Sequence, residues 1–135
     1  MYLLDTNVWL ERLLGQPHAE DVRQLLEAVP ATDLFITDFA FHSICVILTR
    51  LKKTQTLEDF VEDVFIDGAV TILALQPEET SELLSAMRRF KLDFDDAYQY
   101  IAAEKYALTL VSFDNDLKRT PSGKQSPAEA LAALQ

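Results

Sequence analysis

The chain has 135 residues, of which 49% are hydrophobic, and a formal net charge of −10 from 22 acidic and 12 basic side chains. This length fits one domain with its own core, so we expect a single domain over residues 1–135. The single cysteine, Cys45, excludes an internal disulfide framework and a CxxC zinc site. The acidic balance argues against binding nucleic acid through a generally basic surface.

Short apolar runs alternate with amphipathic segments along the chain. The pattern predicts strands at about 2–5, 34–36, 70–75 and 108–111. Between and after them it predicts helices at about 7–14, 17–29, 38–53, 57–65, 77–90, 93–106 and 127–134. The stretch 120–125 is expected to be a loop. Strands that alternate with helices indicate an α/β fold, with a central, mainly parallel sheet flanked by helices in three layers.

Nothing in the sequence resembles a targeting segment or a membrane span. The strand pattern begins at Tyr2, and the longest apolar stretch, 39–48, is interrupted by His42 and Ser43. A spanning helix needs about 20 apolar residues. We therefore expect no membrane association and a cytoplasmic location.

Carboxylates follow two of the predicted strands and open one of the predicted helices. Asp5 ends the first strand, Asp114 and Asp116 follow the fourth, and Asp96 lies at the start of the helix at 93–106. Each also fits an ordinary role as a helix cap or a solvated turn. In parallel sheets, however, ligands bind beyond the carboxyl ends of the strands. Carboxylates gathered there repel one another unless a cation is present, and oxygen ligands favour Mg²⁺ or Mn²⁺.

Two segments of the sequence carry a family resemblance. The opening "LLDTNVWL" and the later "LDFDDAYQYIAAEKYALTLVSFDNDLKR", in this order, resemble the PIN domain, the fold of VapC-type metal-dependent ribonucleases. The resemblance extends to about Arg119. It implies that Asp5, Asp96 and Asp114 are catalytic and hold one or two Mg²⁺ or Mn²⁺ ions, with Asp116 as an additional ligand.

The resemblance also assigns supporting roles. Thr6, Asn7 and Ser112 are expected to orient the carboxylates or bound water through hydrogen bonds. Three further expectations concern partners: an RNA substrate, an antitoxin protein and a second copy of the chain in a homodimer. We expect three side chains of two local basic clusters to contact the RNA backbone: Arg88, Arg89 and Lys118.

The chain departs from the family pattern at one place. PIN domains usually carry a glutamate in the helix after the second strand, which here falls near His42 and Ser43 in "ITDFAFHSICVILTRLKK". His42 could take the place of that glutamate, as a metal ligand or as a contact to the substrate. Alternatively, it has an ordinary packing or capping role in the helix. The sequence thus favours a Mg²⁺- or Mn²⁺-dependent ribonuclease, and the resemblance to VapC-type proteins implies the toxin of a toxin–antitoxin pair. The alternative is a catalytically weak or inactive PIN-like module that binds RNA or protein.

Overall fold

Four short parallel strands form one sheet in the computed structural model, which describes all 135 residues. Their order is β3-β2-β1-β4, and their bounds are β1 Tyr2–Leu4, β2 Leu34–Thr37, β3 Thr71–Leu73 and β4 Thr109–Val111. β1 lies between β2 and β4, with Tyr2 opposite both Leu34 and Thr109. The expected parallel α/β sheet is confirmed, although β3 is shorter than predicted because only three residues of this exposed edge strand pair with β2.

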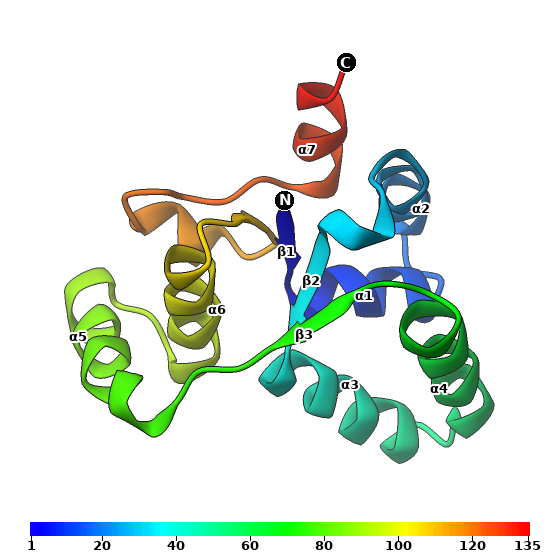
Figure 1. Cartoon of the computed structure of the whole chain (residues 1–135), viewed down its shortest axis with the longest axis horizontal. Helices are drawn as coiled ribbons and strands as arrows, with labels where there is room; N and C mark the ends of the chain where they lie inside the picture. Colours follow the sequence, from blue (N-terminus) through cyan, green and yellow to red (C-terminus); the bar gives the residue numbers. More distant parts are fainter.

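Seven α-helices surround the sheet (Figure 1). Their bounds are α1 Thr6–Leu13, α2 Ala19–Ala28, α3 Asp38–Arg50, α4 Thr54–Val61, α5 Thr80–Phe90, α6 Phe94–Lys105 and α7 Pro127–Ala133. α4 continues into a π-helical turn, Glu62–Ile66, and β4 is followed by a 3₁₀ turn, Asn115–Arg119. Ser126 and Glu129 form the predicted capping box of α7.

The two faces of the sheet bury two separate cores, because successive strand side chains point in opposite directions. Leu3 and Leu110 pack with residues of α5 and α6, while Leu4 and Val111 pack with residues of α1 to α4 and α7. Figure 1 shows α5 and α6 on one side of the sheet and α1 to α4 on the other. The result is a three-layer arrangement of helices, sheet and helices.

The order of the strands defines where a ligand crevice forms. β1, β2 and β3 follow one another across the sheet, and the chain then returns to place β4 on the other side of β1. In such sheets the crevice lies at the carboxyl ends of the two strands where the order reverses, here β1 and β4. Asp5 directly follows β1, and its backbone N–H donates to the carbonyl of Val111 at the end of β4 at 2.9 Å.

Beyond β4 the chain returns once to the sheet. Gln125 forms an isolated parallel bridge with Val111, donating its N–H to Leu110 and accepting from the N–H of Ser112, both at 2.9 Å. The rest of the stretch 120–125 is irregular, as expected. No helix combines the length and the apolar character that crossing a bilayer requires.

Candidate metal centre

Asp5 occupies the crevice between β1 and β4. It is the N-cap of α1 and is only 7% exposed. Its Oδ1 accepts from the backbone N–H of Thr6 at 2.7 Å and from Gln99 Nε2 at 2.9 Å, and its Oδ2 accepts from Ser112 Oγ at 2.7 Å. Three donors thus fix the carboxylate, and Oδ2, with a single donor, keeps lone-pair capacity for a cation.

The hydroxyl of Ser112 joins the end of β4 to the end of β1. It donates to Asp5, and it accepts from the N–H of Asp114 at 2.9 Å and from Asn7 Nδ2 at 3.3 Å. Asn7 Oδ1 in turn accepts from the N–H of Phe113 at 3.3 Å. Of the three residues expected to orient carboxylates, Ser112 touches Asp5 through its side chain, Thr6 through its backbone, and Asn7 only through Ser112.

Three further carboxylates gather beside Asp5. One oxygen each of Asp96, Asp114 and Asp116 lies within 4.8 Å of the others. Asp96 is 7% exposed and lies in the first turn of α6, where its N–H donates to the capping carboxylate of Asp93 at 2.9 Å. Asp114 caps the 3₁₀ turn after β4 by accepting from the N–H of Asp116 at 2.8 Å. The structure therefore brings together acids that are separated by up to 20 positions in the sequence, and this set of hard oxygen donors suits Mg²⁺ or Mn²⁺.

The carboxylates perturb one another. Burial, a hydrogen bond with Asp114 and repulsion by neighbouring acids raise the pKa of Asp96 to about 8. Burial and the charge of Asp114 also raise the pKa of Asp5, against the opposing effect of its hydrogen bonds from Gln99 and Ser112. In the absence of a cation, Asp96 therefore keeps its proton at neutral pH, and a bound cation would replace that proton.

Gln99 is a site residue that the sequence interpretation missed. It lies in the middle of α6, is 2% exposed, and donates to Asp5. Its Oε1 is buried without a hydrogen-bond partner. One signal pointed to it: a glutamine three positions after Asp96, one helical turn away, belongs to the same face of α6.

The basic residues that were expected to contact RNA lie on two segments that the fold joins. Arg88 and Arg89 are exposed in the last turn of α5, and Lys118 is exposed in the 3₁₀ turn after β4. Arg119 connects the two segments, because its guanidinium donates to the carbonyl of Lys91 at 2.8 Å and to Asp116 at 2.9 Å. Asp116 belongs both to this turn and to the acidic group, so Lys118 lies two residues from one of the carboxylates.

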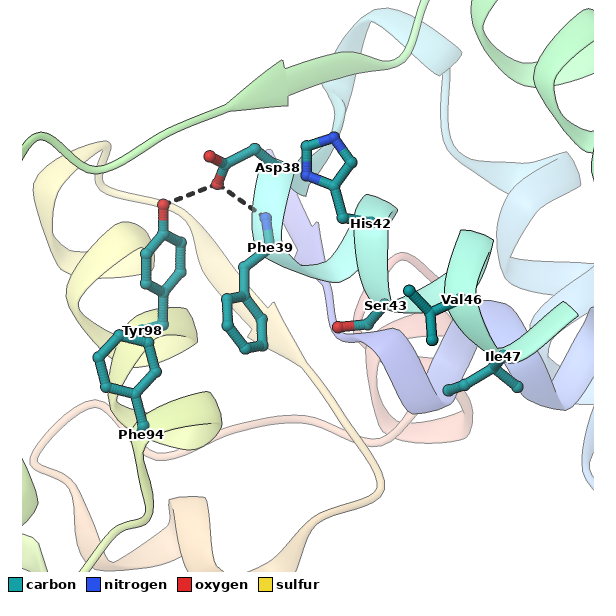
Figure 2. Close-up of a pocket in the computed structure, with 8 residues that line it drawn as sticks. All are labelled: Asp38, Phe39, His42, Ser43, Val46, Ile47, Phe94 and Tyr98. Atoms are coloured by element: carbon teal, nitrogen blue, oxygen red, sulfur yellow. Dashed lines mark hydrogen bonds between the residues drawn. The ribbon is translucent and has the colours of Figure 1, made fainter. Parts of the chain in front are cut away.

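His42 and Ser43 do not belong to the group of three carboxylates. They line a cavity of about 590 Å³ between α3 and the first turns of α6, together with Phe39, Phe94 and Tyr98 among others (Figure 2). His42 is exposed and Ser43 half-buried. No acidic side chain of α3 stands in their place; Asp38, at the start of the helix, accepts from the hydroxyl of Tyr98 at 2.7 Å.

The comparisons with known proteins identify the family of the chain. The sequence model of the PIN domain family matches residues 2–123, and the chain belongs to this family. None of the curated proteins compared with the chain matches it in sequence.

Solved structures with the same fold cover nearly the whole chain. A toxin–antitoxin complex from Klebsiella pneumoniae has a chain that is 18% identical, with a TM-score of 0.77 over 96% of this chain and 99% of that one. FitAcB from Neisseria gonorrhoeae is 21% identical, with a TM-score of 0.77 over 94% and 98%. VapC20 from Mycobacterium tuberculosis, described as a toxin that cleaves the sarcin–ricin loop, is 13% identical, with a TM-score of 0.73 over 86% and 92%.

The raised pKa of Asp96 predicts how stability depends on pH when no metal is present. The folded protein holds this proton up to about pH 8, whereas the unfolded chain releases it near its ordinary value of 3.8. Because the folded state then binds more protons, the contribution of Asp96 to the free energy of unfolding decreases between these pH values. Urea unfolding in EDTA should show that Asp96→Asn gains stability over the wild type as pH rises from 5 to 8.

The matched control is Asp67→Asn, which removes an exposed acid that does not belong to the carboxylate group. Its difference from the wild type should stay constant over the same pH range. A constant difference for Asp96→Asn as well would contradict the perturbed titration.

Removing the amide of Gln99 should weaken metal binding. Gln99→Leu keeps most of the volume but deletes the donor to Asp5 Oδ1, so the carboxylate loses part of its fixed orientation. Losing a partner that orients a metal ligand typically costs about 10- to 100-fold in affinity, and we expect calorimetric titration with Mn²⁺ to show a loss near the lower end. The control is Gln24→Leu on α2, where the amide is exposed, and it should bind Mn²⁺ like the wild type. Equal affinities of the two variants for Mn²⁺ would exclude a role of Gln99 in orienting Asp5.

Proposed function

We propose that the chain is a Mg²⁺- or Mn²⁺-dependent ribonuclease that hydrolyses RNA phosphodiester bonds. The observation that carries this proposal is the placement of Asp96, Asp114 and Asp116 within 4.8 Å of one another, beside the buried Asp5. Membership of the PIN domain family supports the same conclusion. The activity of VapC20, a toxin that cleaves the sarcin–ricin loop, supports an RNA substrate.

Asp5, Asp96 and Asp114 would hold the cation, with Asp116 as a further ligand. When bound, such a cation supplies Lewis acidity, which polarises a phosphate oxygen and lowers the pKa of the attacking water. Hydrolysis forms a bond between that water oxygen and phosphorus and breaks the bond to the leaving oxygen, which takes up a proton. Ser112 and Gln99 keep Asp5 oriented for this role through their hydrogen bonds.

The basic residues would bind the RNA backbone on one flank of the site. Arg88 and Arg89 at the end of α5 and Lys118 after β4 are exposed on segments joined by Arg119. Their charges oppose the repulsion that a chain of net charge −10 exerts on a polyanion. Arg119 itself is engaged with Asp116, so its charge is partly neutralised locally.

The alternative is a catalytically weak or inactive PIN-like module that binds RNA or protein. The observation in its favour is the absence of an acid at the His42–Ser43 position of α3. The remaining four carboxylates still supply the donors that a divalent cation requires, since such ions retain several water ligands. For this reason we favour the enzyme.

Cleavage of RNA tests the two functions directly. Purified wild-type protein should cleave single-stranded RNA in Mn²⁺ or Mg²⁺, and Asp5→Asn or Asp96→Asn should lower the rate at least about 100-fold, as expected when a ligand of the reacting centre is lost. Asp67→Asn, at an exposed site outside the group, should cleave normally.

Absence of cleavage by the wild type, in both metals, would reject the enzyme. Calorimetry with Mn²⁺ would then distinguish an inert site that binds metal from one that does not bind it.

We further propose that the chain is the toxin of a toxin–antitoxin pair, acts in the cytoplasm, and forms a homodimer. The toxin–antitoxin complex from Klebsiella pneumoniae, which has the same fold, supports the first of these, and the homodimer is what the resemblance to PIN domains implies. Sedimentation equilibrium tests the homodimer, which would have twice the chain mass of 15.3 kDa.

A groove between α1, α2 and α4 offers a place for an antitoxin segment. It has a volume of about 310 Å³ and is lined by apolar and charged residues that include Trp9, Arg12, Leu13, Leu26 and Phe60. Trp9 is 2% exposed, and its indole N–H is buried without an acceptor. A bound segment would pack apolar side chains against Leu13 and Leu26 and would pair an acidic side chain with Arg12, whereas Asp59 and Asp63 on the same wall favour basic neighbours.

Charge reversal at Arg12 tests this surface. When the chain is co-expressed with an antitoxin that forms a complex with the wild type, Arg12→Glu should reduce the amount of complex recovered, because it replaces attraction by repulsion at the rim of the groove. Arg50→Glu, at an exposed position at the end of α3, serves as the control. Equal recovery of both variants would place the antitoxin elsewhere.

A further inference from the structure

The largest cavity of the molecule lies between α3 and the start of α6 and has an aromatic wall (Figure 2). The rings of Phe39, Phe94 and Tyr98 contact one another, with centroids 5.4 to 6.2 Å apart. Phe94 is nevertheless 41% exposed, and across the cavity Val46 is 44% exposed. An aromatic face left accessible in this way suits a flat partner, which can stack on it without rearrangement of the rings.

The cavity adjoins the carboxylate group. Asp38 of the cavity directly follows β2, and Asp5 directly follows the neighbouring parallel strand β1, so the cavity and the carboxylates lie at the same edge of the sheet. Ser43, on the opposite wall, belongs to the stretch of α3 where the sequence interpretation expected an acid and none is present. A strand whose phosphate lies at the carboxylates therefore has this cavity within reach of a neighbouring nucleotide.

The charge of the cavity also fits a base rather than a phosphate. Its only acidic side chain is that of Asp38, which accepts from the hydroxyl of Tyr98 at 2.7 Å and from the N–H of Phe39 at 2.7 Å. No lysine or arginine lines it, and His42 and Ser43 supply polar groups at the rim. A nucleobase is neutral and planar and carries donors and acceptors on its edge, which matches an aromatic wall with a polar rim.

We propose that this cavity binds an unpaired nucleobase of the RNA strand, adjacent to the phosphate at the carboxylates, with Phe94 as the stacking platform. This proposal rests on the proposed ribonuclease function and names the part of the substrate that the site selects. The volume of about 590 Å³ is within the range of pockets for small planar ligands. Because duplex RNA keeps its bases stacked and paired, the cavity selects single-stranded segments.

The experiment pairs a change in the protein with a change in the RNA. The variants are Phe94→Ala and Phe94→Tyr, which preserves the aromatic ring. The control is Tyr106→Ala, which removes a 38% exposed aromatic ring just after the C-terminal end of α6. The substrates are a short labelled single-stranded RNA and versions with one abasic nucleotide on either side of the cleaved bond. Cleavage gives KM and kcat for each combination.

Phe94→Ala should raise KM about tenfold, as loss of one stacked base typically does, with a smaller change in kcat. Phe94→Tyr should retain most of the affinity, and Tyr106→Ala should behave like the wild type. One of the two abasic substrates should raise the KM of the wild type by a similar factor but leave that of Phe94→Ala nearly unchanged. If Phe94→Ala and the abasic nucleotide raise KM independently, so that their effects multiply in the combined measurement, the proposal is wrong.

Binding measurements separate this proposal from the proposed function. On an Asp114→Asn background, which protects the RNA from cleavage, fluorescence anisotropy should show the same coupling between Phe94 and the abasic position. If the wild type never cleaves RNA but the coupling is present, the ribonuclease function fails and the base pocket stands. If sedimentation shows that Phe94→Ala converts a dimer into a monomer and the coupling is absent, the cavity is a face between two copies and the proposal is wrong.

Discussion

The crowding of carboxylates at the crevice between β1 and β4 is the constraint on which the rest of the structure depends. Asp96, Asp114 and Asp116 converge beside the buried Asp5, and burial opposes the charges of Asp5 and Asp96. The chain holds them there with hydrogen bonds: Ser112 connects Asp5 to Asp114, and Gln99 fixes the other oxygen of Asp5. Such an arrangement costs stability in the absence of a cation, and the parallel sheet supplies the rigid strand ends that maintain it.

Much of this could be predicted from the sequence because the signals are local. Apolar runs of three or four residues that end in Asp5 or in Ser112–Asp114 identify strand ends, and parallel strands place these ends at one edge. The capping roles of Thr37 and Asp93 followed from residue type and position, and both side chains accept from the expected backbone N–H groups. The order of the strands, β3-β2-β1-β4, is contained in no local pattern and comes from the structure alone.

The parts that escaped prediction depend on contacts between distant segments. Gln99 is an unremarkable helical residue until the fold places its amide 2.9 Å from Asp5, 94 positions away. Phe39 and Tyr98 would pass for ordinary core residues in sequence, yet they form a wall of an open cavity because α3 and α6 meet at an angle beside β2 and β3. Exposure of Phe94 cannot be inferred from periodicity, since the first residue of a helix belongs to no complete turn.

The distribution of charge explains how an acidic protein can accommodate a polyanion. The basic side chains of α5 and of the turn after β4 lie on one flank of the carboxylates, while the cavity on the α3 flank contains a single acid that is already hydrogen-bonded. A cation between the two flanks would neutralise the crowded centre. Phosphates would then meet positive charge on one side, and a neutral base would meet aromatic rings on the other. Because α3 carries no acid at the His42–Ser43 position, that flank presents no further negative charge that would exclude a base.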